Sequence, residues 1–238
     1  LSIGSFNGGL LQIFSPDGRH VIQPRDLTGF EGEVRFVNTH FYGHMPLDDL
    51  DPPQPGDDEG FRIEDWDVTF SRCRFYKLVS WHNDDNLLYG GAIVASGSRL
   101  TFRNCHFEQN AVISTKRRFA AIARGGAIHA QNCEVTLEST NLRWNYATAS
   151  RVWGNRRGRY SSAAHGGAIW SYQSDLMITG GQFDGNAITH LQHGLAPDSA
   201  RGGAIYVDEP SAFKIERVTF EDNTSLGEGG AIYNASAK

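Results

Sequence analysis

The sequence predicts an all-β protein built as a parallel β-solenoid, and three observations support this fold class. An eleven-residue frame recurs along the 238 residues, the tetrapeptide GGAI recurs with it, and the distance between the two is nearly constant. Self-similarity at such a period is the signature of stacked repeat architectures. The six copies of the frame begin at Val34, Val68, Leu100, Val135, Leu176 and Phe213.

The frame alternates as a half-buried β-strand does. Its positions one, three and eight are nearly always apolar, and positions two, four, seven and nine are mostly polar. A period of two places successive side chains on opposite faces of a strand. The residues expected to point inward are Val68, Phe70, Cys73 and Phe75 in one coil, and Leu100, Phe102, Cys105 and Phe107 in the next.

One part of the repeat has a constant length and the other is free. The second glycine of each GGAI precedes frame position eight by 16, 16, 16 and 17 residues. The segments between the end of a frame and the next GG hold 14, 20, 15 and 5 residues. Stacked coils must keep their walls in register, whereas loops that leave one corner can differ in length. We therefore expect long loops at one corner.

The recurring small residues are expected to make the corners. Glycine permits a positive φ and a close approach of backbone, the alanine of GGAI fits a narrow interior, and the isoleucine starts an inward-facing strand. The asparagine at frame position eleven can form an amide ladder between coils, or close its own turn in a left-handed conformation. The predicted structural positions are Gly90, Gly91, Asn110, Gly125, Gly126, Asn145, Gly166, Gly167, Asn186, Gly202, Gly203, Asn223, Gly229 and Gly230.

The whole chain, residues 1–238, is expected to form a single domain. Residues 1–33 lack the full frame, which indicates a cap or a worn coil, and residues 34–238 hold the repeat coils. Because GGAI opens once more at residues 229–232, we expect the chain to be a piece of a longer protein that stops in mid-repeat.

Composition limits the classes of partner that the chain can bind. A net charge of −5 excludes a globally basic nucleic-acid binder, and no apolar run has the length of a transmembrane segment. Three cysteines make no disulfide framework, and their spacing matches no metal site, so neither a metal nor a cofactor is expected. Cys73 and Cys105 share frame position six, which predicts buried free thiols.

The repeats resemble those of a known family. GGAI paired with FxxN is similar to the passenger repeats of polymorphic outer-membrane proteins of chlamydial type. FxxN is matched at residues 107–110, 183–186 and 220–223, and residues 142–145 carry leucine in place of phenylalanine. The resemblance spans roughly residues 68–234. It implies a right-handed parallel β-helix displayed in an extracellular or cell-surface location, often for adhesion. The six frames predict about six coils.

Two of the variable segments, 111–124 and 146–165, are basic and contain no acidic residue. They leave the same corner on adjacent coils, so we expect them side by side. Arginine forks suit carboxylates and sulfates, and aromatic faces suit sugar rings. The segments are candidates for binding an anionic glycan; alternatively they are solvated loops or contacts to other protein chains. The residues concerned are Lys116, Arg117, Arg118, Arg124, Arg151, Trp153, Arg156, Arg157, Arg159 and Tyr160.

Other candidate positions are weaker. His129, Trp170, Tyr206 and Tyr233 each follow a GGAI and are expected to face outward, as cross-coil packing or as a glycan platform. Many right-handed β-helices are polysaccharide lyases or hydrolases, and the adjacent Asp84 and Asp85 are the candidate acids here. Consecutive strand residues face opposite sides, however, so solvated loop acids are the alternative, and no catalytic residue is assigned.

The function expected first is a non-catalytic, extracellular structural or adhesive module within a larger surface or fibrous assembly. The alternatives are a carbohydrate-active enzyme, namely a polysaccharide lyase or glycoside hydrolase, and a glycan-binding module that uses the basic segments.

Overall fold

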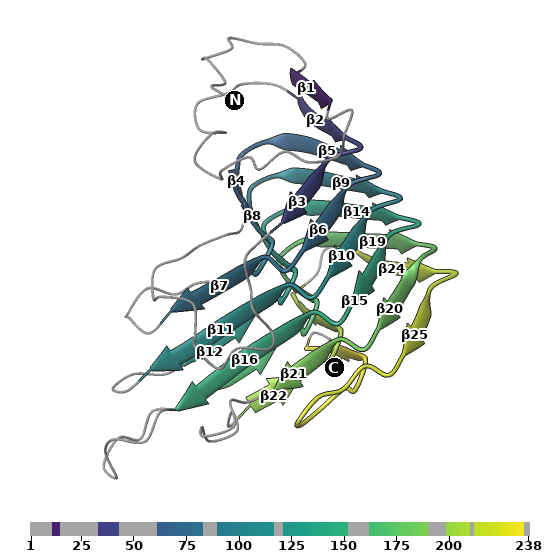
Figure 1. The fold of residues 1–238 in the computed structure, drawn as a ribbon. Coiled ribbons are helices and arrows are strands. Elements are labelled where there is room, and N and C mark those ends of the chain that lie inside the picture. Colours follow the sequence, from purple (N-terminus) through teal and green to yellow (C-terminus); the bar gives the residue numbers. More distant parts are fainter. Residues whose placement is uncertain are drawn as a thin grey trace.

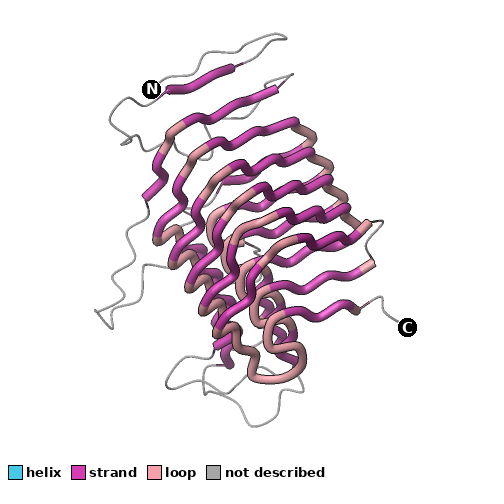
Figure 2. Tube along the Cα trace, turned by 90° about the vertical axis from the view of Figure 1, so that its right-hand side faces the viewer, coloured by secondary structure: helices cyan, strands magenta, loops and turns pink. Residues whose placement is uncertain are grey.

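The computed structural model describes residues 11–14, 33–42, 61–82, 90–116, 121–151, 162–189, 199–209 and 212–235. Within these ranges the chain winds through stacked coils whose strands pair in parallel with the coils before and after (Figures 1 and 2). This arrangement confirms the predicted all-β parallel β-helix.

Three sheets wall the core. Wall 1 contains β4 (Phe61–Glu64), β8 (Ile93–Ser96), β13 (Ile128–Gln131), β18 (Ile169–Tyr172), β23 (Ile205–Asp208) and β26 (Ile232–Asn234). Wall 2 contains β1 (Leu11–Phe14), β2 (Glu33–Val37), β5 (Asp67–Ser71), β9 (Arg99–Arg103), β14 (Glu134–Glu138), β19 (Asp175–Thr179) and β24 (Phe213–Glu216). Wall 3 contains β3 (His40–Tyr42), β6 (Arg74–Tyr76), β10 (His106–Glu108), β15 (Asn141–Arg143), β20 (Gln182–Asp184) and β25 (Thr219–Glu221).

Two further sheets follow wall 3 and form a projection that we call the fin (Figure 1). Its outgoing sheet contains β7 (Val79–His82), β11 (Ala111–Lys116), β16 (Tyr146–Arg151) and β21 (Ala187–Thr189). Its returning sheet contains β12 (Ile122–Arg124), β17 (Ala163–His165) and β22 (Ser199–Arg201).

About four turns are complete, fewer than the six predicted. The runs β4–β7, β8–β12, β13–β17 and β18–β22 each pass through all three walls and the outgoing sheet. The first frame contributes β2 and β3. The last frame contributes β24 and β25, and its continuation reaches the fin only through the single bridges Ala187↔Thr224 and Arg201↔Glu228. Of the predicted N-terminal cap, β1 adds a strand to wall 2 by pairing with β2.

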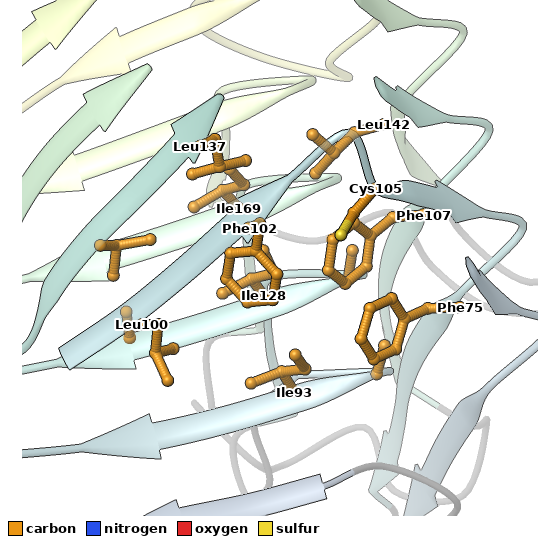
Figure 3. Close-up of a cluster of buried hydrophobic side chains, with 14 of the residues drawn as sticks. Phe75, Ile93, Leu100, Phe102, Cys105, Phe107, Ile128, Leu137, Leu142 and Ile169 are labelled. Carbon is orange, nitrogen blue, oxygen red and sulfur yellow. The ribbon is translucent and has the colours of Figure 1, made fainter. Parts of the chain in front are cut away.

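The interior is a stack of like side chains, as the alternation predicted (Figure 3). Phe70 lies on Phe102 with ring centroids 5.1 Å apart and planes 5° apart, and Phe75 lies on Phe107 at 4.3 Å and 3°. All four rings are fully buried. Burying a side chain of this size stabilises the fold by about 1.5–3 kcal/mol, so the column of rings is a main source of cohesion between coils.

The two glycines of GGAI have separate tasks. Gly125 has a φ of +67°, in the left-handed region. Gly126 needs no unusual dihedral, but a Cβ there would lie 2.1 Å from the carbonyl oxygen of Gly167 in the next coil. The first glycine therefore turns the corner and the second lets successive corners stack closely.

The asparagines form the predicted amide ladder. Asn110 Nδ2 donates to Asn145 Oδ1 at 2.9 Å, Asn145 Nδ2 to Asn186 Oδ1 at 2.9 Å, and Asn186 Nδ2 to Asn223 Oδ1 at 2.9 Å. Each Nδ2 also donates to a carbonyl of the coil before, for example Asn145 Nδ2 to Phe107 O at 3.0 Å. The first three asparagines are completely buried, so the ladder satisfies amides that have no access to water.

The expected left-handed conformation does not belong to these asparagines. It belongs to the residue before each one, with φ values of 58° at Gln109 and 52° at Trp144. The asparagine can then point inward, where its amide meets the next coil.

The predicted free, buried thiols are also confirmed. Cys73 and Cys105 are buried and unbonded to each other. Cys105 Sγ donates to Phe70 O at 3.4 Å, as Thr140 Oγ1 does to Phe102 O at 3.2 Å one coil later. The thiol thus occupies the place of a small hydroxyl at this corner.

Replacing Asn145 by alanine is expected to lower the free energy of unfolding by about 2–4 kcal/mol, because it removes the buried hydrogen bonds that the Asn145 amide makes with Asn110, Asn186 and Phe107. Urea unfolding followed by circular dichroism measures the loss. Asn223→Ala is the control, since Asn223 lies at the half-exposed end of the ladder. An equal loss in both variants would contradict the ladder as the source.

Replacing Ser171 by alanine is expected to stabilise the protein by about 1 kcal/mol. Ser171 is fully buried between Ala130 and Val207, and its hydroxyl has no hydrogen-bond partner among the described residues. The matched control is Ser174→Ala, which should destabilise, since Ser174 Oγ donates to Tyr172 O at 2.8 Å and accepts from Cys133 N at 2.9 Å. Thermal melting of both variants tests the opposite signs.

Candidate functional site

The segments predicted to be free loops at one corner begin and end as strands of the fin. The outgoing strand β11 pairs with β7 and β16, and the returning strand β12 pairs with β17. Between the two sheets lies a second small core, separate from the one inside the walls. It consists of Val112, Ala121, Ala123, Ala147, Ala149, Ala164, Ile188 and Ala200.

Alanine explains the shape of the fin. Its methyl group fills little space, so two sheets that share an alanine layer can lie close together and form a thin projection. Ser114 Oγ also accepts a hydrogen bond from Ile122 N at 3.2 Å, which ties β11 to the start of β12. The prediction of unconstrained loops is therefore wrong for residues 111–116, 122–124, 146–151 and 163–165.

The structure places the ends of the two basic segments next to each other. Lys116 and Arg151 are paired in register as the last residues of β11 and β16. Asp84, Asp85 and most of the predicted basic and aromatic positions lie outside the described residues. Those positions are Arg117, Arg118, Trp153, Arg156, Arg157, Arg159 and Tyr160.

Arg124 lies on the returning strand β12, where it packs against an aromatic ring. Its guanidinium lies 4.7 Å from the ring centroid of Trp170. One coil further on, the imidazole of His165 stacks on Tyr206 at 4.5 Å, and on the following coil Arg201 lies 4.9 Å from the ring centroid of Tyr233. The returning strands therefore cover the outer face of wall 1 with a row of cations and imidazole.

This cover favours cross-coil packing, one of the two alternatives expected for the outward column after GGAI. His129, Trp170 and Tyr206 are only 2%, 4% and 5% exposed. His129 stacks on Trp170 with ring centroids 4.2 Å apart, and Tyr206 stacks on Tyr233 at 5.5 Å. The column is cross-coil packing and offers no open glycan platform on the buried rings.

Sequence reasoning missed His165 and Arg201 as members of this packed row. A signal was present, because Arg124, His165 and Arg201 each stand directly before a GG pair. They pair in register along the returning sheet. What the sequence did not convey is that these strands fold back over wall 1.

Burial among cations sets the protonation of the two histidines. The pKa of His129 is held well below its ordinary value, first by burial and then by the charge of Arg124. Burial, with Arg124 and Arg201 nearby, lowers the pKa of His165 to about 4. Both imidazoles are therefore neutral at pH 7, and His165 Nε2 lies 3.1 Å from Ser199 Oγ.

On the outer face of wall 2, ion pairs connect neighbouring coils. Arg99 lies between Asp67 at 3.1 Å and Glu134 at 2.8 Å, and Arg103 pairs with Glu138 at 2.9 Å. Such exposed pairs stabilise little individually, about 0–1 kcal/mol each. These ion pairs help to fix the register of the strands, and they do not form a reactive site.

The described part of the chain groups no three metal-ligating side chains of the His, Cys, Asp or Glu type. Its described residues also include no helix with the length and apolar character needed to cross a membrane.

Comparison with known proteins gives one family match. The Chlamydia polymorphic membrane protein repeat matches residues 217–235, which span the last FxxN and the last GGAI. No curated protein and no solved structure matches the chain. Together with the parallel coils, this match supports the resemblance of the GGAI-type repeats to those of polymorphic membrane proteins.

Stability is expected to fall as the pH falls from about 6.5 towards 4. The folded state holds His129 and His165 at a lowered pKa, so the unfolded state binds more protons below its ordinary pKa of about 6.5. The contribution is complete above that pH and is lost as the pH drops through the folded value of about 4 for His165.

The measurement is the urea midpoint at pH 7.5, 6.0 and 4.5. The double variant His129→Phe with His165→Phe keeps rings in the stack but removes both titrations, so its midpoint should depend less on pH. An unchanged pH dependence in the double variant would rule out these two histidines as its cause.

Proposed function

We propose that this chain is a rigid, non-catalytic module displayed at a cell surface, where it holds an adhesive edge away from its anchoring point. The match to a polymorphic membrane protein repeat supports the surface location. Structural and adhesive roles within a larger surface or fibrous assembly suit a solenoid, because it presents the same face repeatedly along its length.

The observation that carries the proposal is the fin. The walls repeat with nearly constant spacing, and the large differences in segment length between the GGAI copies fall at this corner. There β11 and β16 run outward in register and end at Lys116 and Arg151, directly before the remaining basic residues of each segment. Two acid-free segments thus leave the fin from adjacent strands.

The partner that fits this charge is anionic. Arginine binds carboxylate and sulfate groups through paired hydrogen bonds, and two adjacent segments can engage a polymer at several points. A sulfated or uronate glycan on another cell has this chemistry. An acidic surface on a neighbouring protein chain has it as well and is the alternative partner.

The proposal is tested by removing four cations of the two basic segments together. In the full chain, Arg117, Arg118, Arg156 and Arg157 are changed to serine, and binding to heparin and to polygalacturonate is measured against salt concentration. We expect about tenfold weaker binding or more, with a smaller dependence on salt, because charge-assisted contacts are lost.

The matched control removes four exposed cations from the walls and from the turns between them, namely Arg62, Arg72, Lys214 and Arg217. It has the same net charge as the fin variant but should bind like the parent. Equally weakened glycan binding in both variants would show that the effect comes from net charge alone. It would contradict a binding site in the basic segments. Release of reducing or unsaturated sugar from either polymer would instead support the enzymatic alternative.

A further inference from the structure

One aromatic side chain stands apart from the packed columns. Trp144 follows β15 and lies at the corner between wall 3 and the outgoing fin sheet (Figure 1). It is 48% exposed, whereas the adjacent Asn145 is completely buried in the amide ladder. The indole is therefore attached to backbone that the amide ladder holds in place, but the indole itself is not part of the core.

The backbone of Trp144 is in a conformation that a large side chain disfavours. Its φ is +52°, and of the thirteen non-glycine residues with positive φ in the described part, Trp144 alone carries a ring. The other twelve have polar side chains, and the equivalent position one coil later is Gly185. Holding a non-glycine residue there costs about 1–2 kcal/mol. A strained, exposed tryptophan at a glycine-compatible corner suggests a role outside folding.

Gly185 fixes how the indole lies. A Cβ on Gly185 would stand 2.4 Å from Trp144 Cδ1 and 2.8 Å from Nε1, so the five-membered ring rests over the glycine backbone. Trp144 N also donates to Asp184 O at 2.9 Å. The ring is thus placed before any ligand arrives, and little side-chain entropy remains to be lost on binding.

Polar side chains stand on the strands that lead to this corner, with Arg143 directly before Trp144 and Asp184 directly before Gly185. Arg143 Nη2 donates to Gln182 Oε1 at 2.6 Å, and Arg143 Nε lies 3.9 Å from Asp184 Oδ2. Gln109 occupies the same corner one coil earlier, and its N donates to Arg143 O at 3.0 Å. An exposed apolar ring with a guanidinium next to it in the sequence and a carboxylate on the next coil matches a sugar, which has an apolar C–H face and hydroxyls at its edge.

The surroundings argue against a protein as the occupant. Stable protein interfaces bury about 800 Å² on each partner and have an apolar centre. The large apolar side chains exposed in the described residues are Trp144, Met177 and Leu226. Met177 lies on wall 2 and Leu226 in the last coil, so they form no continuous patch with the indole.

We propose that Trp144 is a binding platform for one pyranose ring of a neutral glycan, with the partly exposed Arg143 and Asp184 next to it to bond its hydroxyls. The site is distinct from the fin and does not depend on the proposed binding of anionic polymers. Because it uses one ring face and an open surface, its affinity for a short oligosaccharide is low.

The test is a fluorescence titration of the full chain with neutral tetrasaccharides built from glucose, mannose, galactose or N-acetylglucosamine, with iodide quenching as a second readout. At least one sugar is expected to change the emission and to protect Trp144 from iodide. Trp144→Asn should weaken that binding about tenfold or more, as loss of a central tryptophan does. Trp144→Phe should retain part of it.

Trp144→Asn also separates binding from folding, because asparagine tolerates positive φ. Its melting temperature should be unchanged or higher, while Met177→Ala, which trims an exposed apolar residue on wall 2, should leave sugar binding intact. The proposal is overturned if no tetrasaccharide is bound, or if Trp144→Asn binds as the parent does. Retained binding of heparin by Trp144→Asn would show that the fin acts independently.

Discussion

The whole structure depends on the parallel register between successive coils. Because β9, β14 and β19 pair position for position, every side chain meets its counterpart from the coils before and after it. A residue is therefore selected for how it packs against a copy of itself. Phenylalanine rings stack, asparagine amides donate to one another, and only glycine leaves room for the carbonyl of the next corner.

The same register continues beyond the walls and makes the fin. Lys116 pairs with Arg151, Arg124 with His165, and His165 with Arg201, although the segments that join outgoing to returning strands differ in length. The segments differ in length only beyond the part of the strands that packs into the alanine-rich core of the fin. The returning strands then cover wall 1, which converts the aromatic column after GGAI from surface into packing.

The sequence predicts the features that repeat in every coil, but not the contacts between the fin and wall 1. The inward columns of Phe70 and Phe102 and the ladder of Asn110 and Asn145 were predictable, because period and spacing fix them. The fin was not, since alternating alanines give a weak strand signal in segments of unequal length. The burial of Trp170 was also missed, because its cover comes from Arg124 on another strand, a contact that no local pattern encodes.

Register also determines where a function can be added to such a repeat. Changing Asn145 disturbs the coils on both sides, since its amide bonds Asn110 and Asn186. Trp144 is the adjacent residue, yet its side chain is 48% exposed and its indole lies over Gly185 of the next coil. An outward corner position can therefore change freely while the inward position beside it keeps the backbone still. Trp144 combines both properties: a replaceable side chain on backbone that its neighbours hold in place.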